Sequence, residues 1–407
     1  MGAAATDLDF EPFHEKLTTA SGISLREQVK WTDFREDARR QGVDLAHCPG
    51  WQLPGEVFVW FKGLMLLRWP RRWWGNCQAT GPARGGNPSF EDDRRRFDAL
   101  ASFYGNRYRG SVVINYLLGA LAVFFALVPA ALLHHHSRLL DVLLHGLELV
   151  CIVVIVGIYW RGRSPGPHGG GQIPVDPGRA RNQRWHERWL DYRGLAERFR
   201  YAELLYPLEA EVVKSFGERD THNDHGGRGW AQRYFEWRFG QAEWPPRQPG
   251  TDEPQRYVAR LRQIMHEQKT YHEGNAAECE AIARRLHWVS GLCFAGTFVA
   301  CVLAMALKDA PWLLLLAAGL PALAASAHGI LATGEYIKLG ESSTATADAI
   351  GRLIGDVDAR PAEGQGRGAP IKPLEPLVPE VRAFWNLVTS EATGWQATLR
   401  DKNVPLP

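Results

Sequence analysis

Three side chains that could carry charge or protons recur at helical spacing inside an apolar stretch of the sequence. Asp141, His145 and Glu148 stand at positions i, i+4 and i+7, so they line one face of a helix. Glu148 falls near the middle of this stretch, where a charge facing lipid costs roughly 2.5–3.5 kcal/mol. The stripe is therefore expected to face protein or water as one wall of a polar path, and in a homo-oligomer it would repeat as acidic rings that attract cations. The alternative is that Glu148 is protonated, or hydrogen-bonded to a neighbouring helix, and only holds the bundle together.

A second candidate group consists of arginines near residue 185. Arg181, Arg184 and Arg188 could bind the phosphates of a nucleotide or of lipid headgroups. Carboxylates such as Glu187 and Asp191 are interleaved with them, which favours an ion-paired, solvated helix face. These arginines are therefore weak ligand-binding candidates.

Other residues that could do chemistry do not form recognisable sites. The consecutive histidines at 134–136 point in different directions, and the histidines at 222 and 225 stand beside glycines, so we expect no metal site. The glycine-rich segment 164–178 lacks the pattern of a phosphate-binding loop, and no hydrolase or metalloprotease motif occurs. We expect no catalytic residues, no cofactor and no enzymatic activity.

Four apolar blocks of about 20 residues are each long enough to cross a membrane. They are Ser111 to Leu133, Leu139 to Trp160, Trp288 to Leu307 and Trp312 to Leu331. Only HHHSR separates the first two and KDAP the last two, so each pair is predicted to form a tight helical hairpin. Buried helices of a soluble protein are the less favoured alternative, because two adjacent pairs of this length are rare in soluble cores.

Charge around the blocks predicts their orientation. Arginines flank the outer ends of both hairpins, at 107, 109, 161, 163, 284 and 285, whereas the connectors carry only Arg138 and Lys308. The positive-inside rule then places both termini and the long middle segment in the cytoplasm.

Six scattered cysteines without a CxxC pair fit a reducing compartment, and the start lacks the pattern of a cleavable signal peptide. The net charge of +2 gives no reason to expect direct DNA binding.

The expected fold class is an all-α membrane protein with two transmembrane hairpins and long cytoplasmic helices, as a homo-oligomeric bundle. The predicted regions are 1–110, 111–161 (first hairpin), 162–287, 288–331 (second hairpin) and 332–407. Helices are expected from about 185 to 205, from about 253 into the third block, around 335–353 and at 378–399, whereas 216–251 is expected to be irregular. The apolar, basic segment 57–74 is read either as an interfacial helix on anionic lipid or as a small core.

Several segments resemble the SLATT group of bacterial membrane effectors. They are FDALASFYGNRYRGSVVINYLLGALAV, RWLDYRGLAERFR, QIMHEQKTYHEGNA and the closing EATGWQATLRDKNVPLP. The resemblance covers roughly residues 93–160 and 180–407. It implies a membrane effector of antiphage defence in the bacterial inner membrane, triggered by a nucleotide second messenger or by a nucleotidyltransferase or sensor partner. It supplies no catalytic residues.

Three functions are weighed on these grounds. The first is an oligomeric, ligand-gated channel or pore that disrupts the inner membrane and has lipids as neighbours. The alternative is a non-conducting membrane scaffold that assembles cytoplasmic defence or signalling partners. A proton-coupled transporter using Glu148 is disfavoured, because both hairpins begin and end on the same side, unlike inverted repeats.

Overall fold

The structure is a computed structural model that describes residues 30–32, 34, 53–67, 90–132, 138–162, 184–205, 230–241, 253–307, 310–359 and 377–399. Within these ranges every regular element is helical. The helices are α3 (Leu53–Met65), α4 (Phe90–Leu132), α5 (Arg138–Gly162), α6 (Trp185–Leu205), α8 (Trp230–Gly240), α9 (Glu253–Ala306), α10 (Trp312–Gly334), α11 (Tyr336–Ala359) and α12 (Val378–Leu399).

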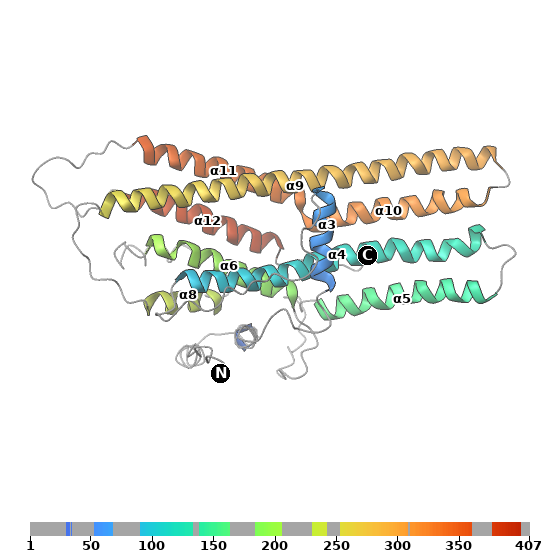
Figure 1. Cartoon of the computed structure of the whole chain (residues 1–407), viewed down its shortest axis with the longest axis horizontal. Coiled ribbons are helices and arrows are strands. Elements are labelled where there is room, and N and C mark those ends of the chain that lie inside the picture. Colours follow the sequence, from blue (N-terminus) through green and yellow to red (C-terminus); the bar gives the residue numbers. More distant parts are fainter. Residues whose placement is uncertain are drawn as a thin grey trace, which may run out of the picture.

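The molecule is elongated and has two halves along its long axis (Figure 1). One half, here called the apolar half, contains α5, α10 and the second parts of α4 and α9. These are four helices long and apolar enough to cross a membrane by length and composition, as the sequence predicted. Their outer surface exposes large apolar side chains such as Val153, Phe298 and Met305. A soluble protein rarely exposes so continuous an apolar surface, whereas lipid covers it at no cost.

The other half, here called the polar half, packs α6, α8, α11 and α12 around the first parts of α4 and α9 (Figure 1). Its core is rich in aromatic rings: Phe97 of α4 stacks on Phe199 of α6 with ring centroids 5.5 Å apart. Trp31 and Phe34, from a short segment far upstream, are 1% and 0% exposed in the same cluster. Each such ring buries roughly 150–250 Å², so this cluster dominates the stability of the polar half.

The regions predicted along the chain are interleaved in space. α4 runs through the boundary at 110/111 and α9 runs through the boundary at 287/288 without a break. α11 and α12, from the last region, pack against α9 and α6. One arm of a long helical hairpin is α9, and the other arm is α10 followed by α11. The second arm is interrupted at Glu335, whose backbone φ angle of 51° is left-handed.

The expectation of irregular structure throughout 216–251 is wrong for one stretch. Residues Trp230–Gly240 form α8. Trp230, Tyr234, Phe235 and Phe239 lie on its buried side against α6. The glycines and prolines on both sides of this short stretch suggested a loop, but the burial of four aromatic rings stabilises a helix between them.

α3 crosses the long helices at the junction of the two halves (Figure 1). It packs mainly on α4 and more lightly on α9. A Cβ on Gly110 of α4 would lie 1.5 Å from the carbonyl oxygen of Pro54, so only glycine permits this crossing. Of the segment 57–74, residues 57–65 belong to α3, and those beyond 67 lie outside the described residues.

Candidate functional site

The stripe predicted to line a path lies in the apolar half, on α5. Asp141 and Glu148 are half-buried and share the helix face of Cys151, Ile155 and Ile158, which are buried. Since α5 packs mainly on α4, this face is the one directed toward α4. The two carboxylates therefore lie along a seam between neighbouring helices.

His145 lies beside this seam. Its Nδ1 is 3.2 Å from Oε2 of Glu148, and its side chain is 59% exposed. The pair forms one polar spot on a helix whose outer surface is otherwise apolar. A path lined by these groups needs further helices to cover that exposed side, which fits an oligomer better than a single chain.

Of the weak ligand candidates, Arg181 lies outside the described residues, and Arg184 and Arg188 line a crevice of only about 10 Å³. Such a space is too small for anything larger than a water molecule. The guanidinium of Arg188 donates a hydrogen bond to the hydroxyl of Tyr104 at 2.8 Å. Arg188 thus links α6 to α4.

The histidine-rich segments considered for metal binding, at 134–136 and 221–227, lie outside the described residues. Among the residues that the structure describes, no three His, Cys, Asp or Glu side chains gather as a metal site would require.

A cavity of about 510 Å³ lies in the polar half, next to the junction. Cavities of 300–1,000 Å³ are typical of small-molecule sites. Helices α3, α4, α6, α9, α11 and α12 all contribute to its wall. The lining residues are Lys62, Ala101, Ser102, Gly105, Asn106, Arg109, Trp189, Leu190, Arg193, Gly194, Glu197, Tyr201, Thr270, Tyr271, His272, Gly274, Asn275, Glu278, Ser343 and Val388.

Three cations and two carboxylates face this cavity. Lys62 forms an ion pair with Glu278, with Nζ and Oε2 2.6 Å apart. Arg193 forms an ion pair with Glu197 and donates a hydrogen bond of 3.2 Å to the hydroxyl of Tyr271. Two of the cations are thus neutralised within the wall.

The third cation, Arg109, is different. It is half-buried, and its guanidinium lies 4.7 Å from the ring centroid of Trp189 and 5.5 Å from that of Phe58. In the described part of the chain, no carboxylate forms an ion pair with it. Aromatic faces attract a cation but leave its N–H donors available to an anion. Arg109 is therefore the group in this cavity best placed to bind a phosphate or carboxylate.

The rest of the wall can recognise a flat, polar molecule. Tyr271, which is 45% exposed, offers an aromatic surface on which a planar ring could stack, whereas the rings of Trp189 and Tyr201 are buried against Tyr108 and Phe384. Asn106 and Thr270 add hydrogen-bonding groups, whereas the side-chain amide of Asn275 already donates to Ser343 Oγ at 2.8 Å. One available cation, an aromatic face and amide groups together suit an anion that carries a planar heterocycle.

His272 in the cavity wall is 6% exposed. Burial lowers its pKa from 6.5 to about 4, although Glu197 raises it, and the nearby cations Arg193 and Arg200 lower it further. The folded protein thus holds His272 neutral at pH values where the unfolded chain protonates it. This contribution to stability is present above pH 6.5 and is lost as the pH falls from 6.5 toward 4.

We expect the wild-type chain to lose about 2 kcal/mol of stability through His272 between pH 7.5 and pH 5. The variant His272→Gln, which cannot be protonated, should show a correspondingly flatter pH dependence. Melting temperatures followed by tryptophan fluorescence in detergent at the two pH values measure this difference. Identical pH dependences for the two proteins would contradict the assignment.

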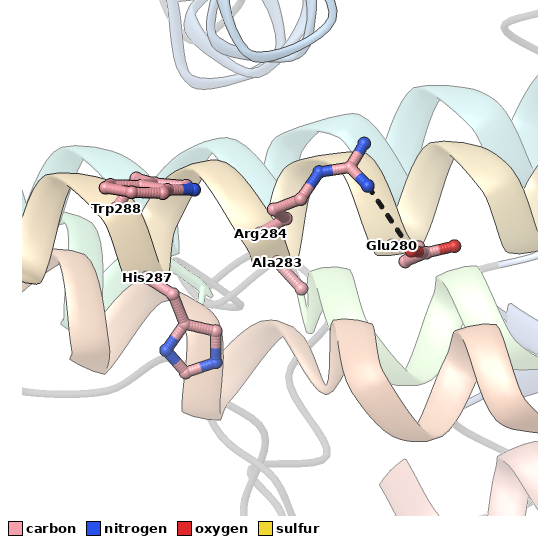
Figure 2. Close-up of a pocket in the computed structure, with 5 residues that line it drawn as sticks. All are labelled: Glu280, Ala283, Arg284, His287 and Trp288. Carbon is pink, nitrogen blue, oxygen red and sulfur yellow. Dashed lines mark hydrogen bonds and ion pairs between the residues drawn. The ribbon is translucent and has the colours of Figure 1, made fainter.

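A second hollow, of about 490 Å³, lies on the surface of α9 where this helix enters the apolar half. Figure 2 shows that its labelled residues, Glu280, Ala283, Arg284, His287 and Trp288, come from successive turns of the same helix. Arg284 pairs with Glu280 at 3.4 Å, and Trp288 is 67% exposed. A surface lined by a single helix does not enclose a ligand, so we do not treat it as a binding site.

Sequence reasoning missed most of the cavity. It used Arg109 only to orient the first hairpin. The short-range signal that could have found Arg109 is weak: an arginine just before a membrane span is an ordinary feature. Only the packing of α3, α4 and α6 places it between two aromatic rings.

No protein-family model, no curated protein and no solved structure matches this chain. Its function therefore has to follow from the cavity and the four apolar helices themselves.

Proposed function

We propose that this chain is a ligand-gated effector of the bacterial inner membrane, with the polar half in the cytoplasm. In this proposal an oligomer of the chain forms an ion channel or pore and acts in antiphage defence. The observation that carries the proposal is that two helices connect the cavity with the spans. Both α4 and α9 line the cavity and continue without a break into the apolar half. A ligand that changes the packing of these helices in the cavity must also shift their other ends.

The chemistry of the cavity supports a nucleotide as the trigger. Arg109 would bind a phosphate, and the exposed ring of Tyr271 would stack on a base. The resemblance to SLATT effectors leads to the same ligand class by a separate route. The groups that would line the ion path are Asp141, His145 and Glu148 of α5.

Ion flux from liposomes that contain the purified full-length chain tests this function. We expect one member of a panel of linear and cyclic nucleotides to release a trapped ion and to raise the melting temperature. The variant Arg109→Gln should weaken this response at least about tenfold, because a charged hydrogen bond to phosphate contributes more than 1.4 kcal/mol. Arg284→Gln is the matched control: it removes an exposed arginine near the same level of the bundle, outside the cavity.

The conducting role of α5 is tested in the same liposomes. Glu148→Gln removes the charge but keeps the shape, so it should alter cation flux while leaving the nucleotide-induced rise in melting temperature intact. Nucleotide binding without flux would instead favour the non-conducting scaffold. If no nucleotide shifts the melting temperature or causes flux at millimolar concentration, the ligand-gated channel is wrong.

A further inference from the structure

Helix α3 has an orientation unlike that of any other described helix. It lies across the bundle at the junction of the polar and apolar halves (Figure 1). The close contact between Gly110 and Pro54 fixes one end of it, one residue before the first predicted span begins at Ser111. α3 is therefore at the level where a membrane surface would meet the molecule.

The side chains of α3 divide among three surroundings. Phe58 and Phe61 are 4% and 6% exposed in an apolar cluster with residues such as Val113 and Ile282. Lys62 faces the cavity of the polar half and pairs with Glu278. A third set is apolar yet exposed: Leu53 at 65%, Trp60 at 46% and Leu64 at 50%.

The direction of the exposed set follows from helix geometry. At about 100° per residue, Leu53, Trp60 and Leu64 lie within about 40° of one another, and Lys62 lies on the opposite side. Because Lys62 points into the polar half, the exposed apolar stripe points toward the apolar half. The spans of that half also expose large apolar side chains.

Two other tryptophans lie near the same level of the bundle. Trp160 is near the end of α5 and Trp288 is on α9, and they are 62% and 67% exposed. Figure 2 shows Trp288 on α9 close to Arg284. Tryptophans gather at the headgroup layer because their rings are apolar and their N–H groups remain hydrated. Trp60 extends this belt onto α3.

We propose that α3 is an in-plane interfacial helix that binds the lipid surface, with Trp60 and Leu64 at the boundary between headgroups and acyl chains. An amphipathic helix in this position buries its apolar face about 5–10 Å into that boundary. The occupant of the exposed stripe is lipid, since the stripe points toward the half whose helices are long and apolar enough to cross a membrane. Through Lys62 the same helix forms the wall of the cavity nearest the membrane.

Photocrosslinking of the full-length chain in lipid nanodiscs tests this proposal. The variants Trp60→p-benzoylphenylalanine and Leu64→p-benzoylphenylalanine should give covalent lipid adducts, identified by mass spectrometry. The same photoreactive residue at Phe298, exposed on the apolar half, is the positive control, and at Glu267, exposed on the polar part of α9, the negative control. We expect about tenfold more adduct at 60 and 64 than at 267.

The outcomes are distinct. Lipid adducts at 298 but not at 60 or 64 would overturn the proposal. Crosslinks from position 60 to a second copy of the chain would also overturn it and would assign the stripe to an oligomer interface. Neither result depends on ligand gating, so the proposal can fail or succeed independently of the channel function.

Discussion

Arg238→Met is expected to lower the free energy of unfolding by about 3–5 kcal/mol, because it breaks a buried ion pair. Arg238 of α8 donates from Nε to Oδ2 of Asp93 in α4 at 2.9 Å, and the two side chains are 13% and 3% exposed. Burial alone raises the pKa of Asp93, and Arg238 opposes this effect. Without Arg238 the buried carboxylate loses its hydrogen-bonded partner and keeps only the nearby charge of Arg96 to oppose the effect of burial. Chemical or thermal unfolding followed by tryptophan fluorescence measures the loss.

An exposed ion pair provides the matched control. Arg284→Met removes the ion-pair partner of Glu280. The side chains of Arg284 and Glu280 are 61% and 74% exposed. Exposed pairs contribute about 0–1 kcal/mol, so this variant should remain near the wild type. The pair variant Asp93→Asn with Arg238→Met should recover part of the loss, since no charge is then buried. Equal effects of Arg238→Met and Arg284→Met would show that the Asp93 pair is not buried in solution.

Gly110→Ala is expected to detach α3 from the bundle, although it adds one methyl group. The new Cβ would lie 1.5 Å from the carbonyl oxygen of Pro54 and 2.4 Å from its carbonyl carbon. Backbone atoms cannot rotate away as a side chain can, so the two helices must separate. Phe58 and Phe61 then lose their packing, and removal of a single buried phenylalanine already costs about 3–5 kcal/mol.

Hydrogen–deuterium exchange measures this result directly. Residues 53–65 should exchange much faster in Gly110→Ala than in the wild type, while the polar part of α9 stays protected. Gly355→Ala in α11 is the matched control, because a Cβ there meets nothing within 4 Å. Unchanged protection of α3 in Gly110→Ala would mean that the crossing is looser than the structure describes.

Local sequence patterns were enough for the spans and for several polar helices. In lipid the backbone groups of a chain are satisfied within a helix or in a closed barrel, and apolar blocks of about 20 residues have the length of helices. The predicted helix at 378–399 matches α12, and the predicted start at about 253 matches α9. The helix expected at 335–353 is α11, Tyr336–Ala359. α8 escaped prediction because it is short and flanked by turn-forming residues.

The sequence determined that the three candidate residues on α5 share a helix face, but not which helix that face contacts. Spacing placed Asp141, His145 and Glu148 on one broad face of a helix. It could not say which neighbour that face meets, and the structure directs Asp141 and Glu148 toward α4 and leaves His145 exposed. Helical periodicity defines a direction within one helix, whereas the partner depends on the packing of all helices.

By itself, then, the sequence determined that this chain is helical and has four membrane-length spans, because composition and period act over a few neighbouring residues. The tertiary structure alone decided that Lys62, Arg109, Arg193 and Tyr271, which belong to four different helices, line one cavity. It alone placed α3 across the junction, through a contact between Gly110 and Pro54 that are 56 positions apart in the chain. Such contacts depend on close packing between distant segments, and no local pattern of residues encodes them.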